Sequence, residues 1–324
     1  MCTAMLFKNG DTYFGRNLDL DKSYGEEVVI TPRNFLFPFR HKETLNSHYA
    51  IIGMAKVVNN YPLYFDATNE KGLSIAGLKF QDNATYFDFR WERENIAPFE
   101  FIPWILCQAK DVVEAEKMIK NINIIDTDFS EELQNTPLHW IISDKEKSIT
   151  VESVEKGIMV YENKAGVLTN NPSFDIQMFN LNNYAHLTNK IPQNTFSERL
   201  ELNNYTGGLG ALGLPGDYSS MSRFVKTSFM KENSSCRQVE LESVGQFFHI
   251  MDSVSQVRGI NLMENGEFDI TLYTSCCNTD KCIYYYTTYE NHRISAVKMY
   301  NEDLNADTLI KFELVQTQQI KYIN

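Results

Sequence analysis

The start of the chain predicts a β-hairpin whose return strand leads back toward the chain terminus. Two largely apolar segments, residues 3–7 and 12–16, flank a turn at residues 8–11. The turn contains Asn-Gly, the strongest short-range hairpin signal, because both residues tolerate the positive φ that a tight hairpin turn requires. A return strand of this kind brings Arg16 and Asp19 back toward residue 2, which is a cysteine.

The thiol of Cys2 becomes a candidate nucleophile if Met1 is removed, because the residue then also carries a free α-amine. An unperturbed α-amine has a pKa of about 7.7–8.0, so part of it is a neutral base near pH 7. Such an amine takes the role that histidine plays in a catalytic triad. Arg16 at close range would favour the thiolate of Cys2, and Asp19 would hold the amine in place. A cysteine at position 2 has no functional meaning by itself, because some residue must follow the start methionine in every chain. It is the combination of Cys2 with Arg16 and Asp19 that supports its interpretation as a nucleophile.

The order of the segments predicts an α+β fold. The chain of 324 residues is 43% hydrophobic, which is enough for a sizeable core, and no Pro/Ser/Gly-rich linker or repeat divides it. We therefore expect a single domain over residues 1–324. Strand-like segments occupy most of residues 1–80, 139–169 and 269–299, and helix-like segments lie at 98–122, 174–187, 219–232 and 244–257. This order predicts helices on the faces of mostly antiparallel sheets.

The charge and the cysteines exclude several classes of partner. A net charge of −12 argues against nucleic acid or an anionic membrane as partner, although a small anionic substrate needs only one or two local cations. No apolar run reaches membrane-spanning length, and the N-terminus lacks the basic start and apolar stretch of a signal peptide. We expect a cytoplasmic protein with six free thiols. Cys107, in an apolar helix-like run, is expected to be a core residue.

Other hydrolytic chemistries lack their motifs. No serine lies in G-x-S-x-G, and no H-E-x-x-H or paired histidine suggests a metal. His139 in an apolar strand and His249 after two phenylalanines are expected to be core residues rather than bases. The glycine-rich stretch at 206–216 lacks the preceding strand and the Lys-Ser/Thr of a phosphate-binding loop, so we expect a flexible loop. The sequence therefore indicates neither a metal nor a cofactor.

Motifs along most of the chain resemble the choloylglycine hydrolase family, which contains bile salt hydrolases and penicillin V acylases. The first is Met1-Cys2-Thr3 followed by Tyr13-Phe14-Gly15-Arg16-Asn17-Leu18-Asp19. Others are Asn69-Glu70-Lys71-Gly72-Leu73, Pro98-Phe99-Glu100-Phe101-Ile102-Pro103-Trp104, Val167-Leu168-Thr169-Asn170-Asn171-Pro172, Gly213-Leu214-Pro215-Gly216-Asp217 and Ser222-Arg223-Phe224. The resemblance implies a four-layer αββα sandwich of the N-terminal nucleophile hydrolase type, assembled as a homotetramer. It also implies amidase chemistry without metal or organic cofactor.

The resemblance also implies roles for individual residues. Cys2 matches the family nucleophile, and Arg16, Asp19, Asn170 and Arg223 fall on the other catalytic positions. Bile salt hydrolases commonly read Ala-Gly-Leu-Asn-Phe where this chain has Ala76-Gly77-Leu78-Lys79-Phe80. That position is associated with the oxyanion hole. Lys79 still supplies a backbone N–H there, whereas its side chain is either solvated or available to pair with a substrate anion.

The activity implied is hydrolysis of the amide bond of glycine- or taurine-conjugated bile salts through a thioester on Cys2. The pocket for the steroid should be apolar, and its expected residues are Leu18, Val58, Phe65, Phe129 and Leu133. A penicillin V acylase, or another N-acyl amide hydrolase of the family, is the alternative, because Lys79 matches neither the Asn of bile salt hydrolases nor the aromatic residue frequent in penicillin V acylases. A non-catalytic bile-acid binder is less favoured, since Cys2, Arg16, Asp19, Asn170 and Arg223 occur together.

Overall fold

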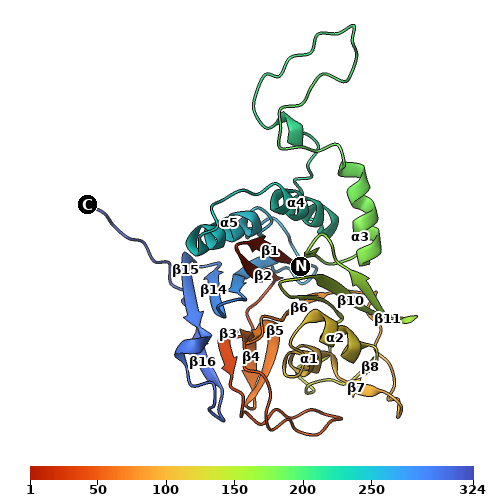
Figure 1. The fold of residues 1–324 in the computed structure, drawn as a ribbon, viewed down its shortest axis with the longest axis vertical. Helices are drawn as coiled ribbons and strands as arrows, with labels where there is room; N and C mark the ends of the chain where they lie inside the picture. Colours follow the sequence, from red (N-terminus) through yellow and green to blue (C-terminus); the bar gives the residue numbers. More distant parts are fainter.

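Two antiparallel β-sheets form the centre of the molecule in the computed structural model, which describes residues 1–324 (Figure 1). The six-stranded sheet contains, in spatial order, β12 (Val167–Leu168), β1 (Cys2–Asn9), β2 (Asp11–Leu20), β13 (Ile270–Asn278), β14 (Ile283–Thr288) and β15 (Asn291–Lys298). The eight-stranded sheet contains β11 (Gly157–Glu162), β10 (Ser148–Val154), β9 (Leu138–Ser143), β6 (Ser74–Lys79), β5 (Tyr61–Asn69), β4 (Ile51–Val58), β3 (Glu27–Thr31) and β16 (Ile310–Glu313).

Helices cover the outer face of each sheet. Helix α4 (Ser220–Glu232) contacts β1, and α5 (Glu240–Asp252) contacts β2 and β13; α3 (Phe174–Leu181) lies against α4. On the other side, α1 (Phe101–Leu106) contacts β5 and β6, and α2 (Val112–Ile119) packs into the same apolar cluster. Because β1 and β2 in turn contact β6 across the interior, the layers run helix, sheet, sheet, helix. The expected four-layer αββα sandwich is confirmed (Figure 1).

The core has two apolar clusters, one that extends from the space between the sheets to α4 and α5 and one under α1 and α2. Strand β4 contributes to both, because Ile52 and Met54 belong to the first cluster, and Ile51 and Ala55 belong to the second. Side chains alternate between the two faces of a strand, so β4 is apolar on both. Cys107, at the end of α1, is buried in the second cluster, as expected.

Most predicted elements are present, and the differences have local causes. Asp111 caps α2 as expected, since its Oδ1 accepts the N–H of Glu114 at 2.8 Å. Helix α5 lies earlier than residues 244–257, and the acidic residues Glu240 and Glu242 suit its first turn. The parallel pair β7 (Glu94–Ile96) and β8 (Ile122–Ile124) and strand β16 were not predicted, because their few residues show no clear periodicity. The remaining short helices are 3₁₀ turns at η1 (Pro98–Glu100), η2 (Asn182–Tyr184), η3 (Leu209–Ala211) and η4 (Met299–Asn301).

The segment between α3 and α4 leaves the body of the molecule as a long arm, drawn in green at the top of Figure 1. The predicted loop at residues 206–216 forms its base and contains only η3 as regular structure. Several large apolar side chains of the arm are exposed to solvent: Ile191, Phe196, Leu200, Leu202, Tyr205 and Leu212. None of the helices has the length and apolar character needed to cross a membrane.

Candidate active site

The β1–β2 hairpin places Cys2 and Arg16 on one face of the six-stranded sheet. Cys2 pairs with Leu18, and Ala4 pairs with Arg16, so Arg16 is the diagonal neighbour of Cys2 on the same face. Diagonal neighbours lie about 7–8 Å apart, which is within reach of a long side chain. The chain turns at Gly10, whose φ is 75°, and Asn9 pairs with Asp11 directly across the turn. The expectation that a return strand brings Arg16 toward Cys2 is confirmed.

Arg16 is completely buried between the two sheets. Its Nη1 donates to the carbonyl oxygens of Phe65, at 3.1 Å, and Gly77, at 2.5 Å, whereas Nη2 has no hydrogen-bond partner. The β4–β5 register shifts here, since Met54 pairs with Asp66 and Ala55 with Tyr64. Phe65 is thus the extra residue of a β-bulge, which leaves its carbonyl out of the ladder and available to Arg16.

The charge of Arg16 is coupled to that of Cys2. Burial by itself lowers the pKa of Arg16, but attraction to the Cys2 thiolate, followed by the negative charges available at Tyr273 and Asp66, raises the pKa above its ordinary value. Arg16 therefore stays positively charged in a buried position beside the thiol. That is the environment expected of a reactive cysteine.

Asn170 and Arg223 meet at the backbone of Cys2. Oδ1 of Asn170 accepts the N–H of Cys2 at 2.8 Å and also accepts Nη2 of Arg223 at 2.8 Å. Nη1 of Arg223 donates to the Cys2 carbonyl and, at 2.6 Å, to Oγ1 of Thr3. Arg223 lies in the first turn of α4, and burial lowers its pKa despite the attraction of Asp19 and Cys2. Two elements far apart in the chain thus fix the backbone on both sides of the Cys2 α-carbon.

Asp19 lies at the same end of the hairpin, where it pairs with Met1. The Asp19 N–H donates to the Met1 carbonyl at 3.0 Å, and the Met1 amine donates to the Asp19 carbonyl at 2.8 Å. The Asp19 side chain is buried; its Oδ1 accepts the hydroxyl of Thr271 at 2.6 Å, and its Oδ2 has no partner. Burial raises the pKa of Asp19 more than the terminal amine and Arg223 lower it. The Asp19 carboxylate, with Oδ2 unpaired, is therefore held near the terminal amine.

Comparison with known proteins assigns the chain to a family. Residues 2–312 match the model of the linear amide C–N hydrolases of the choloylglycine hydrolase type. The chain belongs to the choloylglycine hydrolase family. It is 50% identical to a bile salt hydrolase/transferase of Lactiplantibacillus plantarum and 37% identical to one of Clostridium perfringens, with full coverage of both chains in each case.

Solved structures of this family agree with the fold. A variant of the conjugated bile acid hydrolase of Clostridium perfringens superposes with a TM-score of 0.93 at 36% identity, covering 100% of both chains. A penicillin V acylase of Agrobacterium tumefaciens superposes with a TM-score of 0.75 at 20% identity, covering 97% of this chain and 92% of that one. At this identity the second match supports the N-terminal nucleophile hydrolase fold alone.

Lys79 departs from the family pattern only in a side chain that points to solvent. The Lys79 carbonyl accepts Nδ2 of Asn170 at 2.7 Å, and the side chain is exposed and forms no ion pair or hydrogen bond. Two residues earlier, the Gly77 carbonyl accepts Arg16. Backbone groups of alternate residues point to the same edge of a strand, so the N–H of Lys79 points to the edge of β6 that Arg16 and Asn170 contact.

Three of the expected pocket residues gather at the start of β5, and the other two lie on β2 and at the bulge of β5. Leu18 pairs with Cys2, and half-buried Phe65 packs against Tyr24 with ring centroids 6.4 Å apart. The other three gather around Tyr61: Val58 pairs with Tyr61, the Phe129 ring lies 5.6 Å from the Tyr61 ring, and the Phe129 N–H donates to the Leu133 carbonyl at 3.2 Å.

Several residues near Cys2 were not predicted. Tyr24 covers Phe65, and Asp269 and Thr271 on or beside β13 contact Met1 and Asp19. Asp269 and Thr271 are two positions apart in a segment predicted as a strand, so both lie on one face of it. This spacing was the signal in the sequence that could have indicated a shared polar contact. A bulge between Thr271 and Tyr273 adjusts that face toward Asp19.

The two histidines differ in outcome. His139 is buried; its ring nitrogens contact Glu152 Oε1 at 3.1 Å and the Thr169 carbonyl at 2.8 Å, so the core prediction is confirmed. The core prediction for His249 is wrong, because its side chain is exposed on the outer face of α5 while Phe247 and Phe248 are buried.

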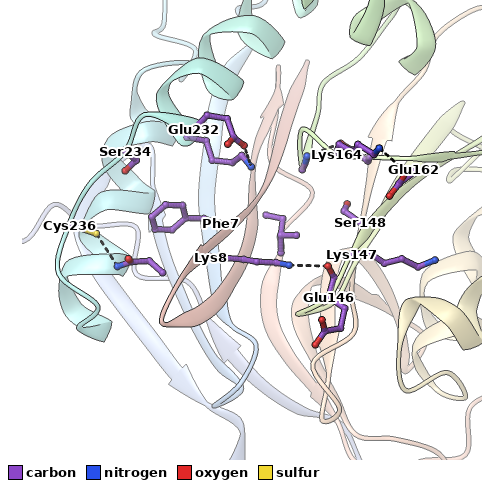
Figure 2. Close-up of a pocket in the computed structure, with 15 residues that line it drawn as sticks. Phe7, Lys8, Glu146, Lys147, Ser148, Glu162, Lys164, Glu232, Ser234 and Cys236 are labelled. Atoms are coloured by element: carbon purple, nitrogen blue, oxygen red, sulfur yellow. Dashed lines mark hydrogen bonds and ion pairs between the residues drawn. The ribbon is translucent and has the colours of Figure 1, made fainter. Parts of the chain in front are cut away.

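One cavity lies away from Cys2. It has a volume of about 490 Å³ and opens at the turn end of β1, between the β9–β10 turn and the end of α4 (Figure 2). Its lysines are already engaged: Lys8 with the Glu146 carbonyl, Lys164 with Glu162 and Lys231 with Glu232 (Figure 2). No candidate catalytic or pocket residue lines it.

Proposed function

We propose that this chain hydrolyses the amide bond between a bile acid and glycine or taurine. The observation that carries the proposal is the convergence of Asn170 and Arg223 on the backbone of Cys2, beside buried Arg16, in a member of an amide hydrolase family. The names of the curated relatives, at up to 50% identity over the full chain, supply the substrate class.

The proposed reaction starts after removal of Met1, which turns the Cys2 nitrogen into a free α-amine. The α-amine takes the proton of the Cys2 thiol, and the resulting thiolate attacks the amide carbonyl and forms a C–S bond. The oxyanion is stabilised by the Lys79 N–H and the Asn170 side chain; one such donor is typically worth about 2.7–4 kcal/mol. The C–N bond then breaks, and the α-amine gives a proton to the leaving glycine or taurine nitrogen.

The resulting thioester is released by water. The α-amine takes a proton from the water as it attacks, and the bile acid leaves while the thiol of Cys2 is restored. Arg16 tunes the thiolate of Cys2, and Asp19 orients the amine. Arg223 holds Asn170 through the shared oxygen.

The acyl pocket in this proposal lies along β5. Leu18 and Phe65 would contact the part of the steroid nearest the scissile bond, and Val58, Phe129 and Leu133 the more distant part. Phe65 and Tyr61, the ring around which the more distant three gather, both lie on β5, which supports this order.

The assembly we propose is a cytoplasmic homotetramer. The arm between α3 and α4 supports the assembly, since Phe196 and Tyr205 are 79% and 84% exposed and would gain from burial against another copy. Six cysteines without disulfides suit a reducing compartment. Sedimentation of the purified protein tests the tetramer.

Turnover of glycocholate, taurocholate and penicillin V, measured by the released amine or acid, tests the function. Hydrolysis of the two bile salts is expected, and the Cys2→Ser variant should lose it. Penicillin V as the better substrate would favour the acylase alternative. Binding of bile salts without turnover, by protein that mass spectrometry shows to begin at Cys2, would indicate a non-catalytic binder.

A further inference from the structure

A buried carboxylate, Asp66 on β5, joins the two sheets directly behind Arg16. It is 2% exposed. Its Oδ1 accepts the hydroxyl of Tyr273 at 2.7 Å; its Oδ2 accepts the hydroxyls of Tyr284 at 2.6 Å and Ser275 at 3.0 Å. All three donors belong to the six-stranded sheet, and Asp66 belongs to the other. The proposed reaction assigns no role to this cluster.

Asp66 is connected to Arg16 by two short routes. The Arg16 backbone N–H donates to Oγ of Ser275 at 3.1 Å, and Ser275 donates to Asp66. The guanidinium donates to the carbonyl of Phe65, the bulge residue next to Asp66. The backbone and the side chain of Arg16 are thus both held by the segment that Asp66 anchors.

The hydrogen-bond pattern suits an ionised Asp66. Ser275 accepts the Arg16 N–H, so its own proton is free to point to Asp66. The two tyrosine hydroxyls supply two further protons, and a carboxylate is acceptor-only when ionised. Burial raises the pKa of Asp66, and attraction to Arg16 followed by these three hydroxyls opposes the shift. Asp66 therefore places a negative charge behind the cation that faces the thiol.

We propose that Asp66 is a positioning residue for Arg16: it fixes the guanidinium between the sheets and reduces the positive potential that Arg16 exerts on Cys2. The inference rests on Cys2 as the nucleophile of the proposed function. Without Asp66, the thiolate would be over-stabilised by Arg16. A thiolate stabilised in this way is a weaker nucleophile, because nucleophilicity falls with basicity.

The test is the Asp66→Asn variant, which keeps the shape of the side chain and removes the charge. The rate of Cys2 alkylation by iodoacetamide is followed against pH, with peptide mapping to identify the labelled thiol. The rise in rate should move to lower pH, so that alkylation at about pH 6 gains relative to that at about pH 8. The kcat for glycocholate should fall by about 100-fold, the usual cost of a reactive group misplaced by about 1 Å, with a smaller change in KM.

Glu70→Gln is the matched control. Glu70 is also a mostly buried carboxylate, directly after β5, but it binds Arg33 and the Ala50 N–H instead. The Glu70→Gln substitution should lower the melting temperature and leave the pH dependence of Cys2 alkylation unchanged. If Asp66→Asn does not fold, Tyr273→Phe and Tyr284→Phe each remove one hydroxyl from Asp66 and should shift the alkylation profile in the same direction by less.

The proposal is overturned if folded Asp66→Asn protein has the same pH dependence of alkylation as the original protein. It is also overturned if the variant loses activity only in proportion to its loss of stability, which is the result expected for Glu70→Gln. Alkylation requires no bile salt. A failure of the substrate assignment would therefore appear as absent turnover with the shifted alkylation profile intact.

Discussion

The backbone nitrogen of Cys2 lies 2.8 Å from Oδ1 of Asn170. The same oxygen accepts Arg223, and Nδ2 of Asn170 donates to the Lys79 carbonyl. The orientation of the amide is fixed by these partners, with its oxygen toward the future α-amine and its nitrogen toward β6. A single side chain thus contacts the proposed base and, in the proposed reaction, also donates to the oxyanion.

Asn170→Ala should lower kcat by about 10²–10³-fold, the usual cost of one oxyanion donor, and should also remove the acceptor of Nη2 of Arg223. Steady-state kinetics with glycocholate measures this. Asn171→Ala is the control, since its side chain is bound only to the Gln81 carbonyl at the surface. Equal activities of the two variants would remove Asn170 from the mechanism.

Lys79→Asn restores the residue common in bile salt hydrolases. Because the Lys79 side chain is exposed and unpaired, and the backbone supplies the N–H, kcat should stay within about threefold of the original. The ratio of kcat/KM for taurocholate and glycocholate is measured as well. A loss of more than about tenfold for taurocholate alone would instead show that the lysine pairs with the sulfonate anion.

Asp19→Asn should raise the melting temperature at neutral pH while activity falls by about 10⁴-fold, as when the orienting Asp of a triad is replaced. The folded-state pKa of Asp19 is raised by burial, so the ionised carboxylate costs stability as pH rises through the interval between its unfolded and folded values. Thermal unfolding and turnover are measured on one preparation.

Asp21→Asn, at a half-buried position nearby, provides the comparison and should change neither quantity. A melting temperature of Asp19→Asn below that of the unmodified protein would contradict the expected cost of the buried charge.

Asp217 should stabilise the start of α4 in a pH-dependent way. Its carboxylate accepts the Ser219 N–H at 2.9 Å and the Ser222 hydroxyl at 2.6 Å, and these hydrogen bonds lower its pKa to about 2. A lowered folded-state pKa gives stability that is present above the unfolded value of about 3.9 and is lost as pH falls toward about 2.

Urea unfolding of Asp217→Ala and the unmodified protein, at several pH values between about 2 and 7, measures this stability. The variant should be less stable at neutral pH, by a small amount since the carboxylate is exposed, and the difference should close in acid. A difference that is constant with pH would assign the effect to the loss of side-chain volume instead.

The hairpin shows how far local pattern determines the site. The Asn-Gly turn and the alternation around it predict a hairpin whose return strand comes back toward Cys2, and the observed hairpin agrees. The register differs by one residue from that of a two-residue Asn-Gly loop, because Asn9 pairs with Asp11 across Gly10. The residues 168 and 221 positions from Cys2 that contact it, Asn170 and Arg223, were assigned only through resemblance. Local periodicity contains no information about which distant elements meet.

Bulges explain what the pattern missed. A strand read with period two assigns Phe65 and Asp66 to opposite faces but does not reveal that one residue is inserted at Phe65. The insertion frees a carbonyl for Arg16 and turns Asp66 toward Tyr273 and Tyr284. Such a shift depends on strand pairing across the sheet, so no single segment reports it.

Met1 is folded into the sheet as the partner of Asp19, and its amine binds the buried carboxylate of Asp269 at 2.8 Å. An aminopeptidase needs an extended, accessible terminus. Trimming therefore competes with folding during synthesis, and a chain that folds first retains a blocked Cys2 nitrogen. Strong overexpression should yield two populations that differ by one methionine and share one fold. The specific activity of a preparation would then depend on the fraction of chains from which the host cell removed Met1 before they folded.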